Sequence, residues 1–422
     1  MRLTSEDTGT WAGCYASVIP PRPFPVLAGF NANIDRVIPV TPALLKILGR
    51  QSGPGFEELR TRLNHSMRYC AADEMVIRSP ERYDAVYRFF ARRGRPALGG
   101  QAGIAAVRLR QLGFGPVTCV VPGAGRKTRA LLEAAGITPC IPGAGTIRQP
   151  DRIHFVLEHA PGLVPLAPGT VPRNNRFIVS PAHDPSTVLI PANAEEPLRA
   201  EIAACRRAFL CGYQYLATEK AFSRAARQLA RIRTANPAMR THVECVGGVL
   251  PRVLERMARL IFPHADSIGL NEQELAAMAR VLAVRDAPDR SGPSLSPAGQ
   301  VRISLAVART LGISRLHLHT FGYYVLVLEP GTGQPLASRD ALLLAAREAS
   351  AAAGGDRRFI SPEGLMAYAA IRTAYGPDEP AGIFQTGDRT VIAVPACISL
   401  PARRTTGLGD IISSVAFAAD PF

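Results

Sequence analysis

A glycine-rich stretch near the C-terminal end of the chain has the residue types that bind an anion beside a carboxylate. Gly407, Leu408 and Gly409 precede Asp410, and an apolar run that predicts a helix follows. Glycine lets the backbone turn tightly, and the first N–H groups of a helix have no partner within it, so such a place binds phosphate readily. Asp410 would then accept the proton of an attacking hydroxyl, as phosphoryl transfer requires. On its own, so short a motif favours the ordinary alternative of an acid in a first helical turn.

Two acidic motifs follow predicted strands earlier in the chain. His242 and Glu244 share one face at the end of a strand, and Asn271 begins a helix with Glu274 in its first turn. Because ligands of open α/β sheets bind at the carboxyl ends of the strands, both glutamates are placed to approach the same phosphate. Together they would hold a hydrated Mg²⁺. The alternatives are a buried polar pair at His242–Glu244 and simple helix capping at Asn271.

Polar residues also follow the first predicted strand, at 26–30. Asn33 and Asp35 are two residues apart, so in extended backbone they point the same way. Gly100 and Gln101 begin a helix of small residues, where backbone can approach a ligand closely. An amide and a carboxylate on one side suit a polyhydroxylated ligand, although an Asx-rich turn would explain the first pair equally simply.

The elements that must position these residues alternate between strand and helix over most of the chain. This alternation is typical of a parallel sheet flanked by helices. A central stretch is different, with β-like segments and little helix at 153–158, 176–180 and 187–190. We therefore predict an α/β fold with a large domain, residues 1–38, 97–150 and 207–422, and a smaller α+β lid domain, residues 39–96 and 151–206. Residues 40–95 are expected to be mostly helical, residues 1–24 to be an irregular lead-in, and residues 285–300 and 352–364 to be loops.

Composition narrows the class of protein. The 422 residues are 47% hydrophobic and carry a net charge of +15, and all but three of the 49 basic residues are arginine. The basic clusters are short and are not interleaved with aromatics, so a nucleic-acid partner is not predicted. No apolar run reaches the ~18–20 residues of a membrane span, and no signal peptide is apparent, which indicates a cytoplasmic protein without a membrane partner. The eight scattered cysteines form no CxxC pair and are expected to be reduced thiols.

Seven motifs occur in one order across the chain and together resemble a known family. They lie at 29–35, 99–104, 174–178, 242–244, 271–274, 319–324 and 407–410. In this order they resemble the ADP-dependent sugar kinases, the ADP-dependent glucokinase/phosphofructokinase group of the ribokinase-like fold. The resemblance implies a cytoplasmic glycolytic enzyme, a monomer or small homo-oligomer, that transfers a phosphoryl group from ADP to a sugar hydroxyl and leaves AMP.

The resemblance also implies a role for each matching residue. Asp410 is similar to the catalytic base, and the N–H groups of residues 407–409 to the anion hole. Arg176 looks like the lid arginine that reaches the donor phosphate. Glu244 and Glu274 resemble the acids that organise Mg²⁺ through water. The sugar-contacting positions of the family match Asn33, Asp35, Gly100, Gln101 and His154.

The acceptor is implied by Glu74. Its segment resembles the one in which glucose-using members carry a glutamate, whereas an ordinary alternative is a solvent-facing glutamate on a lid helix. Arg173 and Arg176 would suit a sugar phosphate, so fructose 6-phosphate is expected as a second acceptor. Three other functions stay open at this point, namely an ATP-dependent ribokinase-type sugar or nucleoside kinase, a non-catalytic sugar- or nucleotide-binding protein of the same fold, and an arginine-rich nucleic-acid binder.

Overall fold

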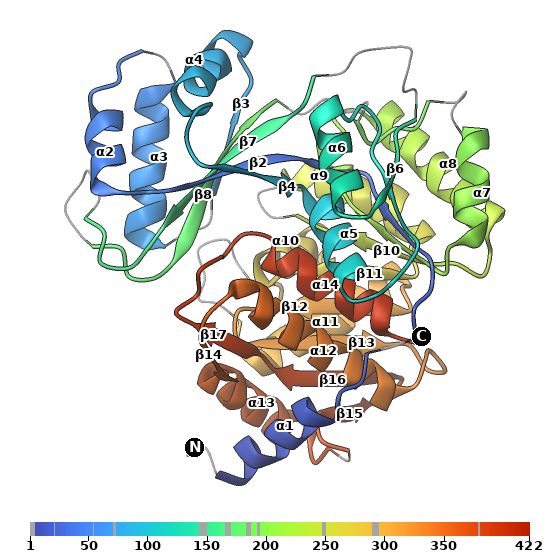
Figure 1. Ribbon diagram of the computed structural model, residues 1–422. Coiled ribbons are helices and arrows are strands. Elements are labelled where there is room, and N and C mark those ends of the chain that lie inside the picture. Colours follow the sequence, from blue (N-terminus) through green and yellow to red (C-terminus); the bar gives the residue numbers. More distant parts are fainter. Residues whose placement is uncertain are drawn as a thin grey trace.

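The strands form two main sheets that lie side by side (Figure 1). The computed structural model describes residues 5–20, 22–53, 55–70, 73–142, 150–164, 170–182, 187–191, 195–246, 250–288, 295–378 and 380–422. The larger sheet has ten strands in the order β15-β16-β13-β12-β11-β10-β9-β1-β5-β6. Seven of them, from β12 to β6, run parallel, and β13, β16 and β15 add an antiparallel edge.

The strands of the larger sheet are short and mostly buried on both faces, as parallel strands covered by helices must be. Their bounds are β1 (Val26–Gly29), β5 (Val117–Val120), β6 (Thr138–Cys140), β9 (Arg207–Leu210), β10 (Arg240–Glu244), β11 (Ser267–Leu270), β12 (Arg315–His319), β13 (Tyr323–Leu328), β15 (Ile383–Thr386) and β16 (Arg389–Pro395).

Helices cover both faces of this sheet. One layer contains α5 (Gln101–Gln111), α12 (Pro335–Ala353) and α14 (Leu408–Ala419), which contact one another, and α1 (Ser5–Ser17) packs against α12. The other layer contains α8 (Glu219–Ala235), α9 (Pro251–Arg256), α10 (Glu272–Val281), α11 (Pro297–Leu311) and α13 (Pro362–Tyr375), with a π-helical turn at Met257–Ile261 and short 3-10 turns at Tyr213–Tyr215 and Phe262–His264. Helices α6 (Arg126–Ala134) and α7 (Glu195–Ala204) complete the larger unit.

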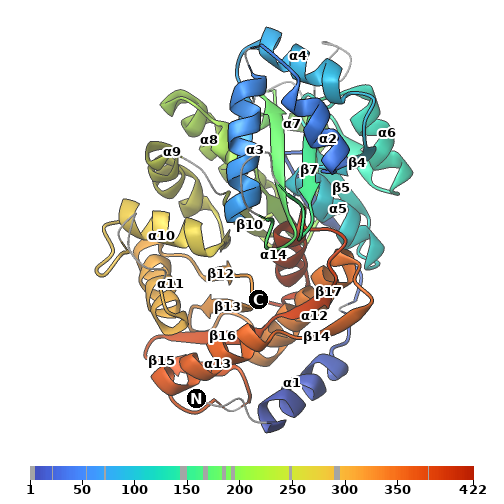
Figure 2. The ribbon, with the colours of Figure 1, turned by 90° about the vertical axis from the view of Figure 1, so that its left-hand side faces the viewer.

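The smaller sheet has five strands in the order β3-β8-β7-β2-β4. They are β2 (Asn33–Pro39), β3 (Asp73–Ile77), β4 (Arg95–Gly99), β7 (Ile153–His159) and β8 (Asn175–Pro181). Helices α2 (Pro42–Gly49), α3 (Phe56–Tyr69) and α4 (Pro80–Phe90) pack on it and share a hydrophobic core separate from that of the larger sheet. These helices and α1 lie at opposite ends of the molecule in both views (Figures 1 and 2).

A two-stranded ribbon of β14 (Arg357–Ile360) and β17 (Cys397–Leu400) lies near the start of α14. All eight cysteines are free thiols, five of them buried. Among the described residues, no helix is long and apolar enough to cross a lipid bilayer.

Four predictions about the elements were wrong. Residues 5–17 form α1, in which Trp11 is fully buried against Tyr368 at a ring distance of 5.0 Å, although the segment has no apolar periodicity. The described residues 187–191 form no strand. The expected loops at 285–300 and 352–364 contain the start of α11, β14 and the start of α13, because Ser296 and Ser361 each cap a helix that begins with proline. The ordinary alternative for Glu74, a position on a lid helix, is also wrong, because Glu74 lies on strand β3.

Candidate active site

The predicted anion site is the start of helix α14. Gly407 caps this helix with a φ of 75°, and a Cβ there would lie 2.7 Å from Ile104 Cδ1, so only glycine fits. Gly409 is packed against His319, whose Nε2 would lie 3.3 Å from an added Cβ. The first N–H groups of α14, beginning at Leu408, have no partners within the helix and are free to bind an anion.

Asp410 lies in the first turn of α14 and meets polar side chains from three parts of the chain. Gln101, the first residue of α5, hydrogen bonds to its carboxylate, while Arg176 of β8 and Arg404 bring positive charge near it. Loss of water around the carboxylate is the largest influence and raises the pKa of Asp410, against the opposing effects of Arg176, Gln101 and Arg404. A carboxylate with raised proton affinity beside two cations suits the acceptance of a hydroxyl proton.

The predicted sugar-contacting pair lies on strand β2 and packs against two glycines, which have no side chains. Asn33 Nδ2 donates to Asp35 Oδ1 at 2.6 Å. A Cβ on Gly99 would lie 2.1 Å from Asp35 Cγ, and one on Gly100 would lie 2.7 Å from Asn33 Oδ1. Gly100 also has a φ of 75°, which favours glycine. The two glycines therefore make the room that the amide and the carboxylate occupy.

The pKa of Asp35 is influenced by charged and polar residues from several elements. Burial raises the pKa of Asp35 to about 7, and the hydrogen bond from Asn33 and the charge of Arg404 oppose this rise. The negative charges of Asp410 and Glu74 add to it. The charges of Asp410 and Glu74 therefore act on Asp35, although the three carboxylates lie on α14, β3 and β2.

Two further predicted sugar contacts come from the smaller sheet. Glu74 is half-buried on β3 and accepts a hydrogen bond from Ser180 Oγ at 2.6 Å. His154 is buried on β7 and is paired with Asp35 in the parallel register of β2 and β7. Neighbours in a parallel register have side chains on the same face, so His154 and Asp35 face the same side of the sheet.

Glu244 ends strand β10 and is fully enclosed by polar partners. Its Oε2 lies 2.9 Å from His242 Nε2 and accepts a hydrogen bond from Ser413 of α14, while its Oε1 lies 3.7 Å from His319 Nε2. Burial raises the pKa of Glu244 well above its ordinary value, and the nearby charges of Glu274 and Asp410 raise it further.

Glu274 is part of a complete capping box at the start of α10. Its two carboxylate oxygens accept hydrogen bonds from the backbone N–H of Asn271 at 2.7 Å and from Asn271 Nδ2 at 2.9 Å. Burial raises the pKa of Glu274 to about 8, and the charges of Glu272 and Asp410 act in the same direction. The predicted capping role is thus correct for Glu274, and the charge of Asp410 also acts on its carboxylate.

The surroundings of the two glutamates fit a hydrated cation better than a directly ligated one. Among the residues that the structure describes, no group of three or more His, Cys, Asp or Glu side chains could hold a metal ion directly. Both glutamates already accept hydrogen bonds from the protein, and both are buried with raised pKa values, so a divalent cation nearby would stabilise their charged forms. Magnesium usually keeps several of its waters, which is consistent with outer contacts of this kind.

A buried polar network fixes α14 over the sheet. His242 Nδ1 lies 2.8 Å from Ser267 Oγ, and Arg315 Nη1 donates to the same hydroxyl oxygen at 3.0 Å. Arg315 is fully buried and donates through Nε to Asp420, just after α14, at 2.9 Å. The middle of α14, where Ser413 contacts Glu244, and the residue just after its end, Asp420, are therefore both tied to the strands below.

Sequence reasoning missed Glu158, which links the two sheets. It lies opposite Arg176 in the antiparallel register of β7 and β8, and its negative charge acts on that arginine. Its Oε1 is 3.5 Å from the backbone N of Thr405 and 3.3 Å from Thr406 Oγ1, in the loop that leads to Gly407. The only sequence signal was a charged residue near the end of an otherwise apolar strand.

Two more contacts join the end of the smaller sheet to the larger unit. Asn174 Nδ2 donates to the backbone oxygen of Ala402 at 3.0 Å. The guanidinium of Arg173 lies 5.2 Å from the ring centre of Phe321, which follows β12. Both predicted arginines, Arg173 and Arg176, therefore lie where the two sheets meet, and Arg176 Nε is buried without a hydrogen-bond partner among the described atoms.

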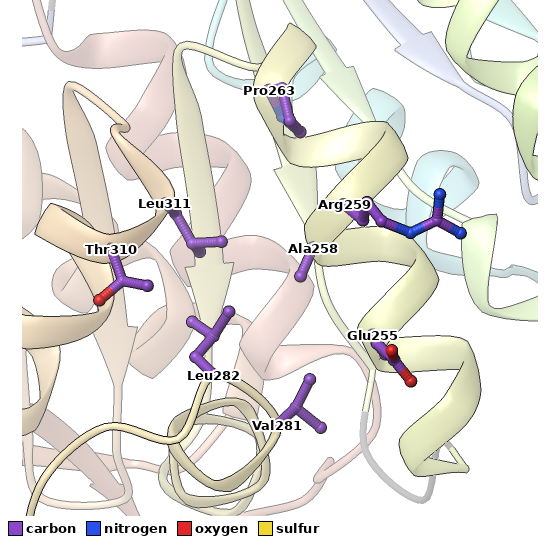
Figure 3. A pocket seen from close by; sticks show the side chains of 8 residues that line it. All are labelled: Glu255, Ala258, Arg259, Pro263, Val281, Leu282, Thr310 and Leu311. Atoms are coloured by element: carbon purple, nitrogen blue, oxygen red, sulfur yellow. The ribbon is translucent and has the colours of Figure 1, made fainter.

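A separate pocket lies away from these residues. It has a volume of about 270 Å³, and Figure 3 shows the side chains that line it, Glu255, Ala258, Arg259, Pro263, Val281, Leu282, Thr310 and Leu311. The C-terminal ends of α10 and α11 contribute to it, so it is at the opposite edge of the sheet from the carboxyl ends of the strands. It contains none of the predicted site residues.

The sequence of this chain is similar to the sequences of known proteins. The conserved region of ADP-specific phosphofructokinases and glucokinases matches residues 24–419. An ADP-dependent glucose/glucosamine kinase of Pyrococcus furiosus is 26% identical over 97% of this chain and 98% of its own length. An ADP-specific phosphofructokinase of Methanosarcina acetivorans is 25% identical over 76% of this chain and 75% of its own length.

The fold is shared with a solved structure described as an ADP-dependent kinase in complex with fructose 6-phosphate and ADPβS. It superimposes with a TM-score of 0.81 at 21% identity and covers 99% of this chain and 98% of its own. The predicted α/β fold, with a large sheet flanked by helices, is thereby confirmed.

Proposed function

Because this chain belongs to the ADP-specific phosphofructokinase/glucokinase family, we propose that it transfers the β-phosphoryl group of ADP to a hydroxyl of glucose and releases AMP. Fructose 6-phosphate is proposed as a second acceptor. The observation that carries the proposal is the meeting of Asp410 with Gln101, Arg176 and Arg404 at the start of α14. Relatives of both acceptor types are about equally distant from this chain, so the acceptor has to be argued from the site.

The proposed chemistry uses the residues of this chain in sequence. Asp410 takes the proton of the acceptor hydroxyl as its oxygen attacks the β-phosphorus. The bond from that phosphorus to the oxygen bridging the α- and β-phosphates breaks, and the electron pair leaves with AMP. The N–H groups at 407–409 and the guanidinium of Arg176 stabilise the negative charge on the transferred group.

Glu244 and Glu274 would hold a hydrated Mg²⁺, and the ion would supply positive charge that offsets the charge of the donor phosphates. The support for this proposal is the pair of buried carboxylates whose charged forms need a cation. His242 and Ser413 orient Glu244, and Asn271 orients Glu274, so the carboxylate positions are set before any ion binds.

We propose that the smaller sheet and helices α2, α3 and α4 act as a lid. Its separate hydrophobic core supports movement as one body, and the contacts of Glu158, Asn174 and Arg173 with the larger unit support a closed arrangement. Closure would exclude water, which is needed to prevent hydrolysis of the donor.

Glu74 supports glucose as the acceptor. Its carboxylate is near enough to Asp35 to raise the pKa of that residue, so it belongs to the same polar site. A carboxylate accepts hydrogen bonds from sugar hydroxyls and repels a phosphate. Glu74→Ala should therefore reduce kcat/KM for glucose by roughly 10- to 150-fold, the value of a lost hydrogen bond to a charged group, and should affect fructose 6-phosphate far less.

The test is release of AMP from ADP with Mg²⁺ and a panel of sugars and sugar phosphates, repeated with ATP and with Glu74→Ala. AMP formation with glucose supports the proposal. A wild-type protein that ignores glucose and uses fructose 6-phosphate well would overturn the assignment of Glu74. ADP formed from ATP, with no AMP formed from ADP, would instead favour the ATP-dependent alternative, and the absence of any turnover would favour a binding protein.

A further inference from the structure

Arg403 and Arg404, which are neighbours in the loop before α14, make different side-chain contacts. The backbone N–H groups of Arg403 and Arg404 both donate to the carbonyl of Ala353, at the end of α12, at 2.8 and 3.1 Å. Arg403 Nη2 then lies 2.7 and 2.8 Å from the two carboxylate oxygens of Asp356, on the exposed surface. Arg404 instead donates through Nε to the carbonyl of Thr406 at 2.9 Å, within the loop that leads to the anion site.

This single hydrogen bond fixes the Nε side of the Arg404 guanidinium and leaves its two terminal nitrogens available. Within the described part of the chain, the two terminal nitrogens of Arg404 make no hydrogen bond, and the side chain is exposed. Its charge acts on both Asp410 and Asp35, which are separate carboxylates of the site. The guanidinium is therefore held at the rim of the active site by the same loop that forms the anion site.

We propose that Arg404 binds the β-phosphate of the donor from the side of the larger sheet, opposite Arg176 of the lid. Its two terminal nitrogens can contact two phosphate oxygens at once, the arrangement in which arginine binds phosphate most strongly. The inference rests on the proposed function, because it takes the diphosphate to be the donor. Two guanidinium groups would then flank the group that is transferred.

The location of Arg404 gives it a different role from Arg176. Arg176 lies on the lid strand β8, so its contact with the donor depends on the lid position. Arg404 belongs to the loop before α14 and is anchored to α12, so its contact needs no lid movement. Arg404 therefore contributes to donor binding before the sugar arrives.

The experiment compares binding of ADP and AMP by calorimetry, with Mg²⁺ and without sugar, in wild type, Arg404→Gln, Arg404→Lys and Arg403→Gln. Arg404→Gln should weaken ADP by roughly 10- to 100-fold and AMP by less than about 3-fold, since AMP lacks the β-phosphate. Arg404→Lys, which keeps the charge, should recover part of the ADP affinity. The matched variant Arg403→Gln should bind both nucleotides as wild type does.

Unchanged ADP affinity in Arg404→Gln would overturn the inference, and so would an equal loss for ADP and AMP. A weakening in Arg403→Gln as large as that in Arg404→Gln would also overturn it, since the effect would then belong to the general charge of the loop. These results are distinct from failure of the proposed function, in which wild type itself would release no AMP from ADP with any sugar.

Discussion

Replacement of Asp35 by asparagine is expected to stabilise the ligand-free protein at pH 8 even though it should impair sugar binding. Asp35 is 7% exposed, and burial raises its pKa from 3.8 to about 7. Asn33 and Arg404 oppose the rise, and Asp410 and Glu74 increase it. Asparagine has nearly the same shape and keeps an oxygen that can accept the hydrogen bond from Asn33, so the substitution removes the charge with little change in packing.

The direction in which the free energy of unfolding changes with pH depends on whether the folded or the unfolded state binds the proton of Asp35 more tightly. Between about pH 4 and pH 7 the folded protein holds a proton on Asp35 that the unfolded chain has released, so the free energy of unfolding falls as the pH rises through this window. The stability that protonated Asp35 provides is complete below pH ~4 and lost above pH ~7. The full difference corresponds to roughly 4 kcal/mol, and water entering the site would reduce the measured value to roughly 2–4 kcal/mol.

The measurement is the free energy of unfolding by urea for wild type and Asp35→Asn, from pH 4 to pH 8, followed by circular dichroism. The other buried carboxylates are the same in both proteins, so the difference between the two curves isolates Asp35. The advantage of the variant should grow from pH 4 to pH 7 and stay constant above pH ~8. An aspartate with the opposite behaviour provides the control. A hydrogen bond from Arg309 lowers the pKa of Asp388, so Asp388→Asn should lose stability at pH 8 and approach wild type at low pH.

A difference between wild type and Asp35→Asn that is the same at pH 5 and pH 8, or a variant less stable than wild type at pH 8, would refute this account of Asp35. Either result would mean that water or an unrecognised cation already compensates its charge in the ligand-free site.

Three other variants test the chemistry and its support. Asp410→Asn should lower kcat for AMP release by roughly 10²–10⁴-fold and leave nucleotide affinity by calorimetry nearly unchanged, and wild-type-like turnover would exclude it as the base. Glu244→Gln and Glu274→Gln should each shift the Mg²⁺ titration of kcat to higher concentration, and unchanged titrations in both would remove them from the metal site. Glu158→Ala and Thr406→Val should each lower kcat/KM by roughly 2- to 10-fold, and the double variant should lose no more than the worse single one, whereas additive losses would show that their contact is unimportant.

The start of α14 could be predicted from sequence because its residues are neighbours along the chain. Glycine, glycine and aspartate within four positions determine the helix start, the positive φ at Gly407 and the place of Asp410 together. Glu244 and Glu274 could be added because the ends of parallel strands meet at one edge. None of these placements needs knowledge of how distant segments pair.

Glu158 and Arg404 could not be predicted in the same way. The contact of Glu158 with Thr406 joins residues that are 248 positions apart and depends on how two sheets meet. Arg404 is next to Arg403 in sequence, and only the bonds to Asp356 and to the carbonyl of Thr406 distinguish the two. The starts of α11 and α13 are a different case, since Ser-Pro at 296–297 and 361–362 is a helix-start signal that the surrounding Gly- and Pro-rich composition obscured.

The division of the site between the two sheets has a consequence for specificity. The chain leaves the larger sheet after β1 and enters the smaller one at β2, so Asp35, Glu74 and Arg176 all belong to the smaller sheet, while Asp410 and Arg404 belong to the larger unit. In the proposed closure, the acceptor contacts Asp35 and Glu74 and the donor contact Arg176 therefore move with the lid, whereas Asp410 and Arg404 do not. An acceptor that does not close the lid leaves its hydroxyl out of reach of Asp410. Binding of the correct sugar therefore also assembles the reactive geometry.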